Sequence, residues 1–213
     1  GLMFAIGAVA AAITPASGTV TRTFVGYTSA GIQGSPYSAS AVNIGTAAAN
    51  RYVVVAVCAS NDALATGSVT VAGTACTRVA AITGSGRPCA LFVTNSPITT
   101  GTTATVVITI GATADIDFAI YTLQGAATPT SPSTATDNTS PLSQAITIPA
   151  GGVAIGVANV FTASTWTGLT KDADGTSANF KGTVASKITS GATTVTASGS
   201  GGDSALCVAA WGP

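Results

Sequence analysis

Two acidic pairs and four cysteines are the residues of this sequence that could do chemistry. Asp172 and Asp174 lie in KDADGTSANF (171–180), a stretch similar to a calcium-binding loop. A complete EF-hand loop would carry a bidentate Glu at its last position, where this chain has Thr183. The stretch also fits a solvated turn between strands, which needs no metal. Asp172 and Asp174 are therefore only weak calcium candidates, and we expect no cofactor.

The second acidic pair, Asp115 and Asp117, alternates along one strand face, where the two could act as ligands or acids or mark the polar start of the strand. The chain has no His and no Glu, so it lacks the usual acid/base at physiological pH and the commonest metal ligand. A Ser-His-Asp or Cys-His site cannot be assembled from it. No H-E-x-x-H, G-x-S-x-G or S-x-x-K motif and no P-loop occurs. We expect a protein that is not an enzyme.

The four cysteines show no C-x-x-C spacing, which argues against a zinc site or a thioredoxin-like centre. Cys58 and Cys207 lie in apolar runs and are expected to be buried thiols. Cys76 and Cys89 flank a polar turn and could form a disulfide across a hairpin, or a cross-link between subunits. A symmetric hairpin would instead place Cys76 opposite Thr94.

Charge is scarce: the 213 residues carry seven basic and seven acidic side chains, for a net charge of zero. The basic residues are scattered and do not form the cluster that phosphate binding requires, so nucleic acid is not an expected partner. A net charge near zero favours association of copies. The hydrophobic fraction of 46% is enough for a substantial core.

Residues 1–20 form a separate segment, which begins with the apolar stretch GLMFAIGAVAAAI (1–13). A membrane-spanning helix needs about 20 apolar residues, so no membrane partner is expected. The stretch could pack on its own domain, dock on a neighbouring subunit, or be the remnant of a secretion signal without its basic flank. The docking interpretation assigns assembly to its bulky side chains, which are Leu2, Met3, Phe4, Ile6, Val9 and Ile13.

Strands are expected throughout, because Thr and Val dominate and Gly and Pro interrupt the chain about every ten residues. The expected strands are 22–29, 38–44, 51–59, 68–73, 77–83, 89–95, 103–110, 117–124, 143–148, 153–161, 165–170, 180–188, 193–198 and 205–211.

The chain also contains pairs of similar sequence segments that lie far apart. The similar pairs are RYVVVAVCAS (51–60) with GGVAIGVANV (151–160), TVAGTACT (70–77) with TWTGLTKD (165–172), LFVTNSPITTGTTATVV (91–107) with GTVASKITSGATTVTA (182–197), and DFAIYTLQG (117–125) with SALCVAAWG (204–212). Low complexity is the alternative explanation for any one pair, but order and spacing hold across all of them.

The repeat predicts an all-β fold in which residues 21–213 form one two-sheet antiparallel β-sandwich, jelly-roll-like, with an internal pseudo-repeat. Its related halves are about 48–125 and 144–213, joined by a Pro/Ser/Thr-rich bridge, 126–143. Neither half is expected to bury its apolar face alone, so the two would share one core.

The order of NRYVVVAV, SVTVAGTACTRVA, PITTGTTATVVIT, IPAGGVAIGVANV, TWTGLTKDADG and ITSGATTVTASGS is similar to that in β-sandwich accessory proteins from the virions of tailed bacteriophages and gene-transfer particles. The resemblance covers about residues 48 to 213 and depends on strands and turns, not on catalytic residues. It implies a structural virion component: a capsid decoration, a neck or collar protein, or a tail-associated protein. Its partners would be other virion proteins and copies of itself.

Two other classes stay open. A receptor- or glycan-binding module of a phage fibre would need an exposed aromatic side chain, for which Trp166 is the candidate, beside Asp172 and Asp174. The second is a secreted bacterial surface or matrix protein. Trp211 ends an apolar strand and is expected to plug the core.

Overall fold

The computed structural model describes residues 18–61, 64–83, 86–126, 133–137, 141–162, 164–199 and 203–213, with only the backbone described for 133–137. The expected assembly residues lie outside this part of the chain; they are Leu2, Met3, Phe4, Ile6, Val9 and Ile13. No helix in the described part is long and apolar enough to cross a membrane.

The described residues are organised in antiparallel strands. These are β1 (Thr21–Gln33), β2 (Tyr37–Asn43), β3 (Arg51–Ala59), β4 (Ser68–Val71), β5 (Thr74–Ile82), β6 (Cys89–Thr94), β7 (Thr103–Thr109), β8 (Ala114–Gln124), β9 (Ser133–Asp137), β10 (Leu142–Ile148), β11 (Val153–Val160), β12 (Thr165–Thr167), β13 (Thr170–Asp174), β14 (Lys181–Lys187), β15 (Gly191–Ser198) and β16 (Ser204–Trp211).

Most of the expected strands are present, and the differences fall at two places. The stretch 165–170 holds a turn at Gly168, whose φ of 80° favours glycine, so it separates β12 from β13. The bridge 126–143 contains β9, which pairs with β16. The bridge therefore contributes a strand to the five-stranded sheet of the second half.

The two halves have the same strand order. The first half forms an eight-stranded sheet in the order β1-β8-β3-β6-β5-β4-β7-β2. The second half forms a five-stranded sheet, β13-β14-β11-β16-β9, and a three-stranded sheet, β10-β15-β12. Each strand of the second half occupies the place of the strand eight numbers earlier in the first half. This order shows the internal repeat, and it extends to β1, β2, β9 and β10, which the sequence comparison did not align.

Each half is a small sandwich of its own. In the first half, β5 pairs with β6 in one layer and with β4 in the other, so that the continuous sheet folds over itself. Between its layers lies a core that includes Val55, Val106 and Phe118. The second half encloses a separate core around Ile146, Ala158 and Val195.

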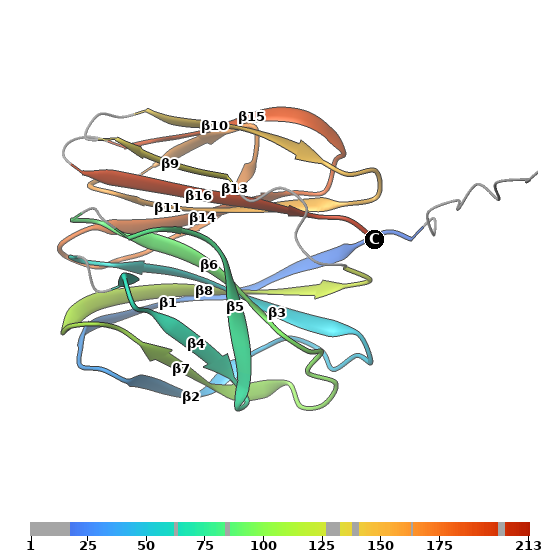
Figure 1. The fold of residues 1–213 in the computed structure, drawn as a ribbon, viewed down its shortest axis with the longest axis horizontal. Coiled ribbons are helices and arrows are strands. Elements are labelled where there is room, and N and C mark those ends of the chain that lie inside the picture. The colour runs from blue at the N-terminus through green and yellow to red at the C-terminus, as the bar shows by residue number, and fades with distance from the viewer. Residues whose placement is uncertain are drawn as a thin grey trace, which may run out of the picture.

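The two sandwiches stack through their five-stranded layers, which gives four layers in all (Figure 1). A third core fills this interface, with Val54 and Tyr121 from the first half against Ile155 and Trp211 from the second. The predicted all-β antiparallel sandwich is confirmed, and so is the buried position of Trp211. The single shared core is corrected to three, because each half supplies a second sheet that covers its own outer face. The jelly-roll connectivity is not confirmed.

The central strands are buried on both faces. Every residue of β8 from Ala114 to Leu123 is buried, and so is every residue of β11 and β16. A strand that is covered on both sides has no wet face, so its sequence is a continuous apolar run instead of an alternation. This explains the run in VAIGVANV and the buried run in VVVAVCA of β3.

A fully buried arginine holds the loops at one end of the first half. The Arg51 Nε donates to the Ile98 carbonyl at 3.0 Å, and its two terminal nitrogens donate to the carbonyls of Gly45 at 2.7 Å and Thr100 at 2.8 Å. These bonds tie the segment that follows β2 to the loop that precedes β7.

We expect Arg51→Met to lower the free energy of unfolding by about 3 kcal/mol, because three carbonyl oxygens lose charged donors in a buried place. Urea denaturation followed by circular dichroism measures the loss. Arg78→Met is the control: Arg78 is exposed, and we expect its change to stay below about 1 kcal/mol. Equal losses in the two variants would contradict the role of Arg51.

Candidate functional site

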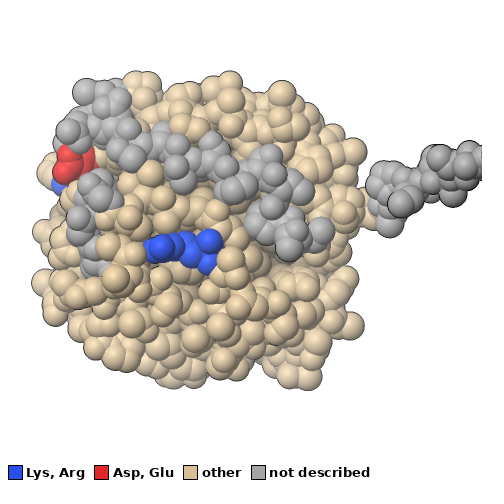
Figure 2. Space-filling model, in the orientation of Figure 1, with Lys and Arg blue, Asp and Glu red and all other residues tan. Residues whose placement is uncertain are grey.

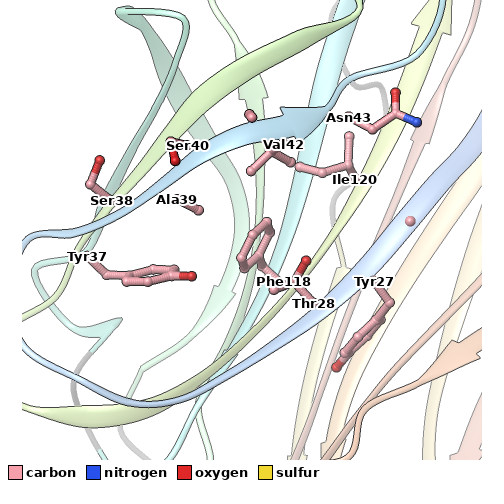
Figure 3. A pocket seen from close by; sticks show the side chains of 12 residues that line it. Tyr27, Thr28, Tyr37, Ser38, Ala39, Ser40, Val42, Asn43, Phe118 and Ile120 are labelled. Atoms are coloured by element: carbon pink, nitrogen blue, oxygen red, sulfur yellow. The ribbon is translucent and has the colours of Figure 1, made fainter.

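A groove of about 540 Å³ opens between β1 and β2 on the first sandwich (Figure 3). The two strands follow each other in the chain, yet they stand at opposite ends of the first-half strand order. Among the residues that the structure describes, β1 pairs with β8 and β2 pairs with β7, each on one side only. Each strand therefore presents an unpaired edge of backbone N–H and C=O groups at the groove.

The floor of the groove is apolar. Tyr37, Ala39 and Val42 of β2 lie over Phe118 and Ile120 of β8 (Figure 3). The rings of Tyr37 and Phe118 are tilted by 59° with centroids 6.3 Å apart, an arrangement that aromatic pairs favour.

The rim of the groove is polar and uncharged, because successive side chains of a strand point to opposite faces. Ser38 and Ser40 point away from the floor, while Asn43 lies at the end of β2 and Thr28 lines the β1 side (Figure 3). The groove thus combines an apolar base, hydroxyl groups and free strand edges, without an ionisable group suited to proton transfer at neutral pH.

The position of β2 depends on a bulge and on the Arg51 loops. Its pairing with β7 shifts register between Ala39 and Val42, and Ala41 has a positive φ of 53°. The Asn43 side chain accepts a hydrogen bond from the Gly45 N–H at 2.9 Å, directly before the carbonyl that Arg51 binds. A bulge of this kind bends the strand that carries it.

β1, which pairs with β8, also contacts the second sandwich. The Tyr27 hydroxyl points away from the groove and donates to Asp117 Oδ2 at 3.1 Å (Figure 3). The Ser177 hydroxyl donates to Asp117 Oδ1 at 2.7 Å, and Ser29 Oγ accepts the Thr176 N–H at 2.9 Å. A polar cluster at the interface between the sandwiches thus anchors β1 to the segment that joins β13 and β14.

Burial disfavours ionisation inside this cluster. Desolvation raises the pKa of the fully buried Asp117 carboxyl, although hydrogen bonds from Ser177, Ser29 and Tyr27 oppose the shift. Desolvation also raises the pKa of the Tyr27 phenol far above its ordinary value, with the charge of nearby Asp117 as a smaller cause. The other member of the acidic pair, Asp115, accepts a hydrogen bond from Asn179 of the second half. Asp115 and Asp117 therefore join the two sandwiches.

The calcium candidates bind different partners. Asp172 pairs with Arg22 at 3.4 Å and accepts hydrogen bonds from Tyr121, at 2.8 Å, and from Ser186. Both aspartates belong to β13, so they lie in a strand and not in the expected loop.

Asp174 pairs with Lys171 at 2.7 Å and accepts the Ser164 hydroxyl at 3.2 Å. In the described part of the chain no group of three or more Cys, Asp, Glu or His side chains could hold a metal ion. The structure does not bring Asp172 and Asp174 together on a shared site.

Trp166 is not the exposed aromatic side chain that a glycan site would need. It is half-buried, it packs against the core of the second half, and its Nε1 donates to Thr183 Oγ1 at 2.9 Å. The absence of a side chain at Gly156 makes room for its ring. The small residues of β11 allow this packing. The threonines beside Trp166 in the sequence had instead suggested an exposed position.

The disulfide that Cys76 and Cys89 could have formed is not present, and all four cysteines are free thiols. The β5–β6 hairpin places Cys76 opposite Thr94, as a symmetric hairpin would, and a register shift between Arg78 and Ala80 then places Cys89 opposite Ile82. Cys58 and Cys207 are buried, as predicted. Burial raises the pKa of the Cys76 thiol to about 12.

No family model matches the chain, and no curated protein and no solved structure is significantly similar to it. The geometry of the described residues must therefore carry any statement about function.

The residues of the groove carry no motif that marks them as a site in the sequence. The alternation of Tyr37 and Ala39 with Ser38 and Ser40 is a signal that could have marked a strand with one polar face. It could not have shown that β2 lacks a partner on one edge, since the pairing of a strand depends on distant segments.

The close packing of the polar cluster around Asp117 depends on glycine, which has no side chain. A methyl group at Gly182 would overlap the Tyr27 hydroxyl and approach the Cys58 Cβ to 3.2 Å. We expect Gly182→Ala to lower the free energy of unfolding by about 2 kcal/mol through overpacking. Gly34→Ala is the matched control, because its added methyl group meets nothing within 4 Å. Thermal denaturation compares the stability of the two variants. If Gly182→Ala is as stable as Gly34→Ala, the two sandwiches are not closely packed at this point.

The raised pKa of Asp117 predicts a pH dependence of stability. The folded protein holds the Asp117 proton more tightly than the unfolded chain, so the contribution is complete below the ordinary carboxyl pKa and is lost as pH rises through the folded value. The free energy of unfolding should fall over this window by at most about 1.4 kcal/mol per pH unit. The side chain that Asp117→Asn introduces cannot ionise, so the decrease in the free energy of unfolding that ionisation of Asp117 causes should be absent in this variant. Urea unfolding at a series of pH values from about 4 upward compares the two proteins, and parallel curves would contradict the assignment.

Proposed function

We propose that the protein is a non-enzymatic structural subunit of a tailed-phage particle, which acts by docking on copies of itself and on other virion proteins. The groove between β1 and β2 carries the proposal. Two unpaired strand edges beside an apolar floor are suited to receive a further strand, with backbone hydrogen bonds on both sides. A capsid decoration, a neck or collar protein and a tail-associated protein are all compatible with this mode of docking.

The edges at the groove lack the charges that usually protect free strands. β2 contains no charged residue, and the one charged residue of β1, Arg22, is paired with Asp172. Natural edge strands are often guarded by lysine, by proline or by a covering segment. An unguarded pair of edges therefore favours a partner that covers them.

The rest of the surface also favours docking by shape instead of by charge. On the face shown in Figure 2, charged side chains appear only in small isolated places. The whole chain has a net charge of zero. Copies of such a protein do not repel one another, and contact between them removes little charge from water.

The occupant that we assign to the groove is the apolar stretch 1–13 of a neighbouring copy. In an extended conformation Leu2, Phe4 and Ile6 would share one face, and Met3, Ala5 and Gly7 would lie on the other. The large side chains match the apolar floor formed by β2 and β8. The stretch has no charge, so its burial leaves no ion without a partner.

Removal of residues 1–13 should leave a folded protein that no longer associates, because the described fold begins after this stretch. Sedimentation velocity at several concentrations compares the truncated protein with the full chain. A synthetic peptide of residues 1–13 with a solubilising lysine tail should bind the truncated protein. Association that survives the truncation would overturn the assignment of the occupant.

A second variant blocks the groove and leaves the stretch intact. Gly26 lies opposite Ile120 on the groove side of β1, and an added Cβ atom there meets nothing within 4 Å. We expect Gly26→Ile to fold normally and to abolish both association and peptide binding. Gly34→Ile is the control, since Gly34 has the same free space and does not line the groove. Binding to a glycan array that Gly26→Ile removes, without any change in association, would favour the receptor-binding alternative.

A further inference from the structure

Three of the four cysteines meet at the interface between the sandwiches. Cys58 of β3 and Cys89 of β6 are opposite each other in the ladder of the first half, and Cys207 of β16 faces them from the second half. All three are buried, and they belong to the same core. The repeat does not explain them, since the sequence has no matching trio elsewhere.

The closest contact in the trio joins the two halves. The Sγ atoms of Cys89 and Cys207 are 3.4 Å apart, and Cys207 Sγ also lies 3.3 Å from the Cys89 carbonyl oxygen. A disulfide has a sulfur–sulfur bond of about 2.0 Å, so the two sulfur atoms would have to approach each other by about 1.4 Å to form one. Cys58 Sγ instead donates to the Ala158 carbonyl at 3.5 Å.

We propose that Cys89 and Cys207 are a modification site, at which oxidation forms a disulfide that covalently joins the two sandwiches. The two thiols lose two protons and two electrons and form one S–S bond. A small-molecule disulfide such as oxidised glutathione accepts the electrons and leaves as two thiols, after a mixed disulfide with one of the cysteines has been attacked by the other.

The timing of the reaction follows from burial. The attacking species is the thiolate, and desolvation raises the pKa of Cys89 well above its ordinary value once the halves have packed. An oxidant also has no access to sulfur atoms that the interface covers. The bond therefore forms while the chain folds in an oxidising solution, and only slowly once the reduced protein is folded.

The bond would act on the unfolded chain more than on the folded one. It closes a loop that runs from β6 to β16 and so spans most of the second half. Such a link restricts the unfolded ensemble, and the effect increases with loop length in the chain-entropy description. In the folded protein it would fix the contact between the five-stranded layers without moving either sheet.

The test is to refold the full chain from denaturant in a mixture of oxidised and reduced glutathione, and in parallel with an excess of a reductant. Peptide mapping by mass spectrometry should find one disulfide, between the peptides that contain Cys89 and Cys207. Only two thiols should then remain reactive in denaturant, and the thermal midpoint should lie above that of the reduced protein. Cys76→Ser, which leaves the trio intact, should retain the bond, and Cys207→Ala should lose it.

Mapping of the wild-type chain decides the proposal even if Cys207→Ala fails to fold. A bond between Cys58 and Cys89 would overturn the proposal, and so would four reactive thiols after oxidative refolding. Cross-links through Cys76 between copies, with Cys89 and Cys207 both free, would also overturn it.

Discussion

The structure depends on the contact between two apolar sheet faces. The five-stranded layer of each half has one face on its own core and the other on its twin, so neither layer has a side that tolerates water. A single half left alone would expose Val54, Tyr121 and Leu91, or Ile155 and Trp211, as a continuous apolar patch. Patches of this kind on isolated domains cause association. The duplication is therefore stable because the two copies cover each other.

Apolar packing alone would allow the two sheets to slide. The polar contacts across the interface fix one arrangement, because each joins groups that are costly to bury unpaired. Asn159 Nδ2 of the second half donates to the carbonyls of Ala59 at 2.9 Å and Pro88 at 3.0 Å in the first. The hydrogen bonds that Asp117 accepts from Tyr27 and Ser177 also fix the arrangement, at another point of the interface. Displacement by one residue would leave these groups without partners, so the interface is specific as well as apolar.

The sequence predicted the class of fold and most strands because both depend on local preferences. The repeat was also visible, but its alignment was wrong where small apolar residues continue without a break. The sequence pair matched Val53 with Val153, yet Val53 faces the core of its own half and Val153 faces the interface. Side chains alternate along a strand, so an error of one residue exchanges the two faces. A strand that is buried on both sides gives no pattern by which such an error could be noticed.

The groove was beyond sequence reasoning, because it depends on which layer of the folded first-half sheet each strand joins. β1 pairs with β8 along its length, and the second half also contacts it: Arg22 is paired with Asp172, Ser177 binds the Asp117 that Tyr27 bonds, and Ser29 accepts the Thr176 N–H. β2 is held instead by β7 and by the Arg51 loops of the first half. β1 and β2 belong to opposite layers of that folded sheet, so the two consecutive strands do not close into a pair. Since contacts that join the halves also involve β1, a change that loosens the interface would also alter the groove, although no residue of the groove had been replaced.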